Sequence, residues 1–307
     1  MSGLVSTIIP VYNRSAMLRE AVASVVAQTY RPIEIIVVDD GSTDETPQTI
    51  RELGVRSVRI ANGGPGAARE AGRQVAEGEF IQYLDSDDLL LPRKFELQVA
   101  ALNARPEAGV AYGLTRYRDA QGNEIECTWK EPNQRQETIL PSFLLARWWE
   151  TSTPLYRRSI TDAAGPWLPL RLEEDWEYDV RVGALGTQLA FVDEYVAEHR
   201  DHPHGRLSKG IALDPDRMRQ RAIAHELIAE SALRAVPREA PEMQHFAREL
   251  FHIARQAGAA GLGDESRRLL RLARRIAPRW DLALYGLTAR AIGWTRAGRL
   301  SMFRERF

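Results

Sequence analysis

Three aspartates, Asp85, Asp87 and Asp88, stand within four residues directly after a short apolar run. Carboxylates this close repel one another, which raises their pKa values unless a cation lies among them. Mg²⁺ and Mn²⁺ prefer oxygen ligands, and Mg²⁺ usually takes one or two carboxylates together with substrate phosphates. The spacing therefore indicates a site for a divalent metal and a diphosphate. A solvated acidic turn that caps the next helix is the alternative interpretation.

Polar residues also follow three other predicted strands. They are Tyr12, Asn13 and Arg14 after the first strand, Asp39 and Asp40 after the second, and Arg69 with the glycine-rich turn 63–66 after the third. An aromatic ring can stack on a base, a carboxylate can accept hydrogen bonds from a ribose, and a cation can neutralise a diphosphate. Each residue alone has a structural explanation, as a core side chain, a helix cap or a surface charge. Their recurrence at successive strand ends favours a nucleotide site.

The elements that must position these residues alternate along the chain. Runs rich in β-branched residues predict strands at residues 4–10, 33–38, 58–60 and 80–84, and apolar spacing predicts helices at 15–26, 44–53 and 67–75 between them. Strands that alternate with helices form right-handed βαβ units and a parallel, doubly wound sheet. Ligands of such sheets bind at the carboxyl ends of the strands, which is where the polar residues are expected.

Composition and charge narrow the class of protein. The chain has 307 residues, 44% of them hydrophobic, and can bury a large core. Residues 1–200 carry a net charge of −9 and residues 201–307 a net charge of +8, which predicts different partners for the two parts. The single cysteine, Cys127, is typical of a reducing compartment. Without a signal-peptide pattern or a run of about 18 apolar residues, we expect a cytoplasmic protein.

Five short segments carry a family resemblance. They read IIPVYNR at residues 8–14, QTY at 28–30, VVDDGSTD at 37–44, GAAR at 66–69 and YLDSDD at 83–88. In this order they resemble the family 2 glycosyltransferases of GT-A fold, and the resemblance covers residues 4–210. Glu70 departs from the family, which usually has asparagine after the arginine of the fourth segment.

The resemblance implies roles for the matching residues. The nucleotide would lie against Pro10, Tyr12, Asn13, Arg14, Asp40, Arg69, Asp85 and Ser86. Asp87 would be the direct ligand of Mg²⁺ or Mn²⁺, and Asp85 would lie nearer the ribose while contributing to the same metal site. Asp88 has no fixed role in the family, so we expect it to cap the next helix.

Residues 170–181 predict the start of a helix with an acidic first turn, where Glu174 and Asp175 precede Trp176. Acidic residues in a first turn interact favourably with the helix dipole, which is the structural explanation. The family has a Glu-Asp pair before an aromatic residue, and that pair supplies the base that takes the proton of the acceptor hydroxyl. The resemblance therefore implies Asp175 as the catalytic base, with Glu174 orienting the acceptor or the helix.

A histidine-rich segment follows a further predicted strand at residues 188–192. It contains Arg200, Asp201, His202 and Pro203, which resemble the R-x-H-P segment of the family. There the histidine closes over the diphosphate and the metal, so the resemblance implies His202 as part of the metal site. A surface loop and a transition-metal site made by several histidines are the alternatives.

From residue 214 onward the pattern is helical, with predicted helices at residues 215–235, 241–258, 264–276 and 280–297. The third of these carries five arginines, Arg267, Arg268, Arg271, Arg274 and Arg275. Two interpretations stay open. The arginines line a solvated helix bundle, or they attach the protein peripherally to the inner face of an anionic membrane, where a lipid-linked acceptor would sit.

These observations predict an α/β GT-A fold with a mainly parallel, doubly wound sheet, followed by C-terminal helices. We expect a GT-A domain at residues 1–212, with a nucleotide-sugar half at 1–105 and an acceptor half at 106–212, and a helical region at 213–307. The expected activity is inverting, metal-dependent transfer from a UDP-, GDP- or dTDP-sugar to a saccharide or lipid-linked saccharide, in polysaccharide or glycoconjugate synthesis. No nucleic-acid partner is expected.

Two other functions compete with this one. The first is a non-catalytic protein that binds a nucleotide sugar or a glycan on the same scaffold. The second is a nucleotidylyltransferase, but the glycine-rich, basic loop expected after its first strand is missing.

Overall fold

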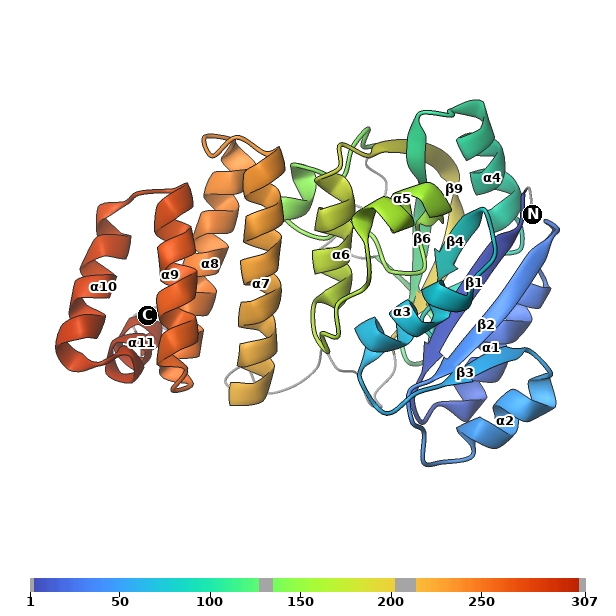
Figure 1. Ribbon diagram of the computed structural model, residues 1–307, viewed down its shortest axis with the longest axis horizontal. Helices are drawn as coiled ribbons and strands as arrows, with labels where there is room; N and C mark the ends of the chain where they lie inside the picture. The colour runs from blue at the N-terminus through green and yellow to red at the C-terminus, as the bar shows by residue number, and fades with distance from the viewer. Residues whose placement is uncertain (1–2, 127–134, 202–213, 304–307) are drawn as a thin grey trace. The chain divides into compact units, whose positions relative to one another are not determined.

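The computed structural model describes residues 3–126, 135–201 and 214–303. The chain divides into two compact units (Figure 1). The first unit contains Met1–Ile139, Arg147–Arg171 and Leu185–Arg206, and the second contains Leu140–Ala146, Leu172–Ala184 and Leu207–Phe307. Two short segments from the region expected to form the GT-A domain therefore group with the C-terminal helices.

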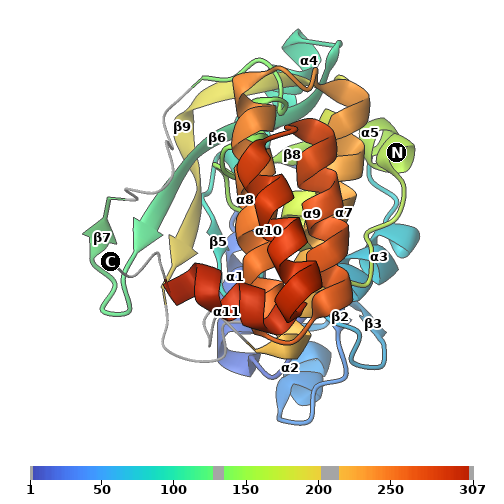
Figure 2. The same cartoon turned by 90° about the vertical axis from the view of Figure 1, so that its left-hand side faces the viewer.

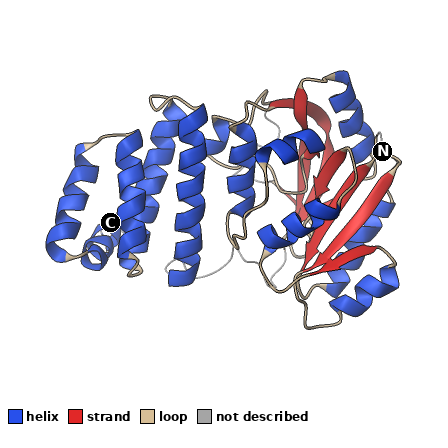
Figure 3. Cartoon of the chain, in the orientation of Figure 1, coloured by secondary structure: helices blue, strands red, loops and turns tan. Residues whose placement is uncertain are grey.

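One mixed sheet forms the centre of the first unit (Figure 3). Its described strands are β1 Val5–Val11, β2 Ile33–Asp39, β3 Arg56–Arg59, β4 Phe80–Tyr83, β5 Leu89–Leu90, β6 Ala108–Arg118, β7 Glu124–Ile125, β8 Leu155–Arg157 and β9 Gln188–Arg200. Their order is β3-β2-β1-β4-β8-β6-β9-β5, and β7 pairs with β6. The first four strands are parallel, as predicted, whereas β8 pairs antiparallel with both β4 and β6.

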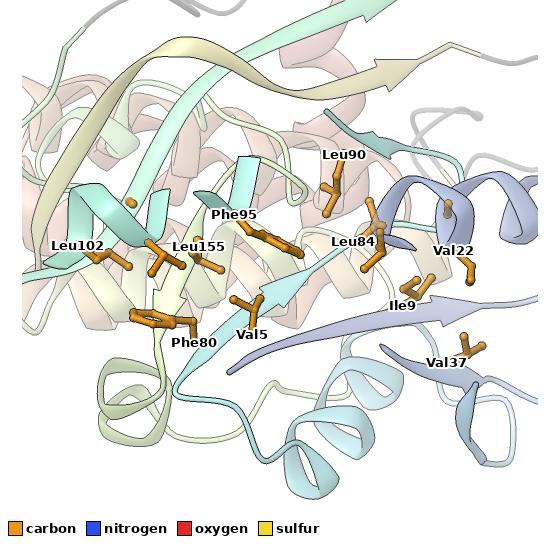
Figure 4. Packing of buried hydrophobic residues seen from close by; sticks show 14 of the residues in the cluster. Val5, Ile9, Val22, Val37, Phe80, Leu84, Leu90, Phe95, Leu102 and Leu155 are labelled. Atoms are coloured by element: carbon orange, nitrogen blue, oxygen red, sulfur yellow. The ribbon is translucent and has the colours of Figure 1, made fainter. Parts of the chain in front are cut away.

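Helices cover both faces of this sheet. Helices α1 Ser15–Val26, α2 Thr46–Leu53 and α4 Lys94–Ala104 bury one face, and α3 Pro65–Val75 and α5 Arg158–Ala164 lie against the other. The core on the first face packs Val5, Ile9 and Val37 against Val22 and Phe95 (Figure 4). On the second face α3 approaches closely at Gly72, because a Cβ there would come within 2.4 Å of the Ile8 side chain. The predicted α/β architecture is confirmed.

The second unit is helical (Figures 1 and 2). Its described elements are the 3₁₀ turn η1 Ser142–Leu144 and the helices α6 Glu174–Gly183, α7 Pro215–Ala235, α8 Pro241–Ala259, α9 Gly263–Ile276, α10 Trp280–Ile292 and α11 Trp294–Phe303. The predicted helix at 280–297 is two helices, because Gly293 has a φ of +90° and ends α10. None of the described helices is long and apolar enough to cross a membrane.

Candidate active site

The residues after β1 lie at the carboxyl edge of the sheet. Pro10 is buried and pairs with β2, while Tyr12 is 45% exposed and so is not a core residue. Asn13 has a φ of 51°, and its Oδ1 accepts a hydrogen bond from Thr43 N at 2.8 Å. Its own N–H donates to Ser42 Oγ at 3.0 Å. These bonds fasten the end of β1 to the loop after β2.

Asp40 joins the same loop to the glycine-rich turn. Its Oδ1 accepts from Gly63 N at 2.7 Å and its Oδ2 from Gly64 N at 2.9 Å. Burial raises the pKa of Asp40, although these hydrogen bonds and the charge of Arg171 oppose the shift. Gly64 has a φ of +88°, a backbone conformation that glycine adopts readily. The carboxylate expected at a base or ribose therefore also holds the turn that starts α3.

Arg69 and Asp85 meet across the sheet edge. Arg69 Nη2 lies 2.6 Å from Asp85 Oδ1, and the Arg69 side chain is only 3% exposed. Although 32% of the Asp85 side chain stays exposed, desolvation by the surrounding chain raises its pKa. The charge of Arg69 opposes this shift, and the nearby Asp87 and Asp88 add to it.

Trp167 supports this pair. The Arg69 guanidinium lies over the Trp167 ring, 4.8 Å from its centroid. The backbone N–H of Trp167 donates to Glu70 Oε2 at 3.1 Å. Glu70, which replaces the asparagine usual in the family, thus anchors the aromatic partner of Arg69.

Asp87 and Asp88 have partners from other segments. Arg14 Nη1 lies 2.6 Å from Asp87 Oδ2, and Arg200 Nε donates to the Asp87 carbonyl at 2.9 Å. Ser152 Oγ donates to Asp88 Oδ2 at 2.9 Å, and His199 Nδ1 lies 2.9 Å from Asp88 Oδ1.

Asp88 therefore does not cap the following helix, contrary to expectation, because its buried carboxylate binds Ser152 and lies beside His199. The N-cap position of α4 is Arg93. Ser86, between the aspartates, is buried and 3% exposed.

Lys94 supports the segment that carries Ser152. The side chain is fully buried, and its Nζ donates to Gln98 Oε1 at 2.6 Å and to the carbonyl of Thr153 at 2.7 Å. Burial lowers the pKa of Lys94 well below its usual value. The amine thus fixes the residue next to Ser152, and Ser152 in turn orients Asp88.

Glu174 and Asp175 belong to the second unit. Helix α6 begins after Glu173, whose φ of 58° is unusual for a residue with a side chain. Glu174 is 7% exposed, and Asp175 Oδ1 accepts from Trp176 N at 2.8 Å. The indole Nε1–H of Trp176 donates to the carbonyl of Phe143 at 2.9 Å, which ties the first turn of α6 to η1.

Glu173 itself is clamped by α7. Arg221 Nε donates to Glu173 Oε1 at 2.9 Å, and His225 Nδ1 lies 2.9 Å from Glu173 Oε2. Burial alone would raise the pKa of Glu173, but the charges and hydrogen bonds of His225 and Arg221 outweigh it and lower the pKa to about 2. The clamp fixes the residue that precedes Glu174 and Asp175.

The family model described as glycosyl transferase family 2 matches residues 6–161, which include the segments around Arg14, Asp40, Arg69 and Asp85. The chain belongs to glycosyl transferase family 2. An uncharacterized glycosyltransferase of Rickettsia prowazekii is 39% identical over 137 residues, which are 44% of this chain and 42% of that protein. The glycosyltransferase GlyG of Streptococcus pneumoniae is 33% identical over 129 residues, 40% of this chain and 43% of that protein. The chain thus spans less than half the length of these two relatives.

Solved structures show the fold of this family 2 glycosyltransferase. S. aureus TarS, residues 1–349 in complex with UDP-GlcNAc, superposes with a TM-score of 0.70 at 22% identity over 98% of this chain and 91% of that one. The mannosyltransferase PcManGT of Pyrobaculum calidifontis, in complex with GDP-Man and Mn²⁺, gives a TM-score of 0.55 at 16% identity over 96% of this chain and 84% of that one. The likeness to TarS confirms the predicted GT-A fold with C-terminal helices.

The expected metal ligands of this family 2 glycosyltransferase can be tested by their chemistry. Among the described residues, no group of three His, Cys, Asp or Glu side chains could hold an ion. Mg²⁺ needs only one or two carboxylates when water and phosphates supply the other oxygens, so Asp85 and Asp87 fit. Their repulsion contributes to the raised pKa of Asp85, and a divalent cation would relieve it. His202 lies outside the described residues.

Four residues at the candidate site, His199, Ser152, Trp167 and Lys94, were not among the predicted site residues. His199 lies three residues before the predicted His202. The histidine-rich segment could therefore have pointed to it. Ser152 bonds to a carboxylate 64 residues away, and Trp167 to one 97 residues away. Lys94 resembles an ordinary surface lysine at the start of a helix. Only the folded chain brings these residues to the site.

Proposed function

We propose that this family 2 glycosyltransferase is an inverting, metal-dependent enzyme that transfers a sugar from a nucleotide-diphosphate sugar to an acceptor hydroxyl, in polysaccharide or glycoconjugate synthesis. One observation carries the proposal. Two arginines and two aspartates, Arg14, Arg69, Asp85 and Asp87, meet in two ion pairs at the carboxyl edge of the sheet. All four lie within the segment that matches the family.

The donor class is supported by the structural neighbours. TarS binds UDP-GlcNAc and PcManGT binds GDP-Man with Mn²⁺. For this chain we propose a UDP-, GDP- or dTDP-sugar, with Tyr12 stacking on the base and Asp40 beside the base or ribose. Pro10, Asn13 and Ser86 would shape the same pocket, and Mg²⁺ or Mn²⁺ would bind Asp85 and Asp87.

The residues divide the chemistry between donor and acceptor. Asp175 takes the proton of the acceptor hydroxyl while its oxygen attacks the anomeric carbon, and Glu174 orients the acceptor or the helix. The bond between that carbon and the diphosphate oxygen breaks, and its electron pair leaves with the diphosphate. A single attack inverts the configuration without a covalent intermediate. Arg14 and Arg69 place positive charge where the leaving diphosphate gains negative charge, and the bound cation would supply further positive charge there.

One observation favours a second function, a non-catalytic protein that binds nucleotide sugars. Each of the two proposed metal-binding carboxylates is already neutralised by an arginine, Asp85 by Arg69 and Asp87 by Arg14. In a protein that only binds nucleotide sugars, both carboxylates could keep their arginine partners at all times. Transfer of sugar to any acceptor, or slow metal-dependent hydrolysis of the donor, distinguishes the enzyme from the binding protein.

The acceptor and the place of action are proposed from the sequence. The acceptor would be a saccharide or a lipid-linked saccharide, and the chain would act in the cytoplasm, at the inner face of the membrane. The basic C-terminal helices would make the membrane contact.

The first prediction separates donor binding from chemistry. Nucleotide sugars that bind should raise the Tm of the chain in the presence of Mn²⁺, and EDTA should remove that rise. Asp175→Asn should keep the same rise, because the residue acts on the acceptor, yet kcat should fall about 10²–10⁴-fold. The control is Asp264→Asn in the same unit, where the side chain is 77% exposed. Loss of donor binding in Asp175→Asn would move Asp175 to the donor site, and no Tm shift with any nucleotide sugar would overturn the proposed function.

A further inference from the structure

Helix α10 carries an apolar face that stays exposed. Trp280, Leu284 and Leu287 are 77%, 54% and 62% exposed, and their four- and three-residue spacing places them on one side of the helix. Leu282 and Tyr285, on the other side, are buried. In Figure 2, α10 lies in front of α8 and α9. Large apolar side chains gathered on an exposed face mark an interaction surface.

A positively charged cavity opens at the start of the same helix. Its volume is about 280 Å³, and α8 and the beginning of α10 contribute to its lining. Three arginines line it, Arg248, Arg255 and Arg279. Asp281 is the one acid among the described lining residues, and Arg279 already binds both of its carboxylate oxygens at 3.0 and 2.8 Å. The guanidinium group is well suited to phosphate and carboxylate oxygens, so the cavity fits an anionic group.

The charge around the apolar face has the same sign. Residues 271–303 contain seven arginines and one acid. In α9, Arg268 is bound to Glu226 at 2.9 Å and Arg275 to Glu230 at 3.3 Å, so part of the predicted basic helix is neutralised within the unit. Arg248 and Arg274 are exposed and have no ion pair among the described residues. Unpaired positive charge thus lies at the cavity beside the start of α10, on Arg248, as well as on α9, on Arg274.

We propose that the α10 surface, defined by Trp280, Leu284, Leu287 and the arginine-lined cavity, docks on an anionic lipid bilayer. A headgroup phosphate would enter the cavity, and the indole of Trp280, next to Arg279, would lie at the level of the headgroups. The two leucines would reach the acyl boundary. Apolar residues flanked by arginines are typical of helices that lie in a membrane interface. The proposal deepens the membrane contact of the proposed function and moves it from the α9 arginines to α10.

Vesicle sedimentation of the full chain tests this surface. Vesicles of phosphatidylcholine with phosphatidylglycerol should bind the chain at low salt, and vesicles of phosphatidylcholine alone should bind it at least tenfold more weakly. Arg248→Glu should weaken binding by about fivefold or more, since each arginine near an anionic surface contributes about that factor. Trp280→Ser combined with Leu284→Ser should weaken it about tenfold or more, because burial of apolar side chains contributes the rest.

Matched controls use exposed residues of the first unit. Arg51→Glu makes the same change of charge as Arg248→Glu, and Val26→Ser removes an apolar side chain that is 56% exposed. Neither should alter sedimentation, and circular dichroism should show all variants folded. The donor-induced rise in Tm should be unchanged in every variant, so failure of this proposal is distinguishable from failure of the proposed function.

Three results would overturn the proposal. The first is no sedimentation with anionic vesicles at low salt. The second is competition by millimolar inorganic phosphate or pyrophosphate with no effect of Trp280→Ser and Leu284→Ser, which would make the cavity a site for a free anion. The third is self-association that those two substitutions abolish while vesicle binding stays at the level of neutral lipid, which would make α10 a contact between copies of the chain.

Discussion

The carboxylates that follow β4 each meet a side chain from a distant part of the chain. Asp85 meets Arg69 of α3, Asp87 meets Arg14 just before α1, and Asp88 meets Ser152 and His199. Because these groups are largely buried, their partners fix their orientation before any donor binds. Charges held in advance cost no reorganisation when the negative charge of a leaving diphosphate develops. The pairs are therefore consistent with a preorganised donor site.

Asp87→Asn tests the carboxylate at the centre of this arrangement. The amide keeps the shape of the side chain but loses the charge that would bind the cation and that pairs with Arg14 at 2.6 Å. Activity should fall about 10²–10³-fold, as when one electrostatic contact of a transition state is removed. EDTA should lower wild-type activity and have little further effect on the variant. Both are measured as initial rates of sugar transfer.

Asp193→Asn is the control for this change. Asp193 lies in β9, is exposed and has no hydrogen bond or ion pair among the described residues. Its substitution should leave the rate unchanged. A wild-type rate in Asp87→Asn, or a wild-type enzyme indifferent to EDTA, would remove the metal from the proposed mechanism.

At the scale of residues, the order of strands along the chain predicted more of the candidate site than the spacing between individual residues did. The segments around Arg14, Arg69 and Asp85 were predicted to converge because parallel strands end at one edge, and in the structure they form ion pairs. Which atoms pair depends on side-chain packing, which has no signature in a single sequence. That is why the sequence did not predict that the Trp167 ring lies under Arg69, or that Lys94 binds the carbonyl of Thr153.

The element that carries the proposed base is held by a neighbouring helix. Glu173 starts α6 in a left-handed backbone conformation that costs free energy for a residue with a side chain. Arg221 and His225 of α7 bind its carboxylate, and the fully buried His225 packs against the rings of both Trp176 and Phe246. The direction of the first turn of α6 thus depends on α7, which follows it by about forty residues.

Glu173→Gln should destabilise the chain in a pH-dependent way. With a pKa of about 2 in the folded chain against 4.5 ordinarily, the ionised carboxylate contributes about 3 kcal/mol at neutral pH. Because the folded pKa is the lower one, this contribution is complete above about pH 4.5 and is lost as the pH falls toward 2. Urea unfolding at pH 7 and at several acidic values measures the difference between wild type and variant, which should shrink as the pH falls.

Glu239→Gln provides the comparison. Glu239 is exposed and has no ion pair among the described residues, so its loss should change the free energy of unfolding by less than about 0.5 kcal/mol. An equally small effect of Glu173→Gln, or an effect independent of pH, would show that the clamp does not hold α6.

Elements were predicted well where the apolar pattern was long and local. The first four strands and helices α1, α3, α7, α8 and α9 lie within a few residues of the predicted positions. The three-residue strand β8 and the short helix α5 were missed, because β8 is defined by its pairing with β4 and β6. The break at Gly293 was also missed, since the apolar spacing continues through it from α10 into α11.

The whole molecule does not divide at one point of the chain. The proposed boundary at residue 212 separates the GT-A region from the helices, but the segments Leu140–Ala146 and Leu172–Ala184 pack with α7 and α8 in the second unit. Trp176 packs edge-on against His225 and Phe246, at 5.3 and 6.0 Å between ring centroids. Sequence position alone could not show this, because a helix is assigned to a unit by what buries its apolar face.

A chain truncated after residue 212 should therefore lose the order of α6 as well as the C-terminal helices. Helix α6, which carries Glu174 and Asp175, would lose the partners that bury Trp176 and that bind Glu173. Transfer should fall at least about 10²-fold, the lower value of a positioned base. Hydrogen exchange should show lost protection at residues 174–183 while the parallel strands β1 and β2, which belong to the other unit, keep theirs.

The control is truncation after residue 303, which leaves every described helix in place and should behave as the full chain. Full activity with unchanged protection of α6 in the shorter fragment would instead make residues 1–212 a self-sufficient catalytic domain.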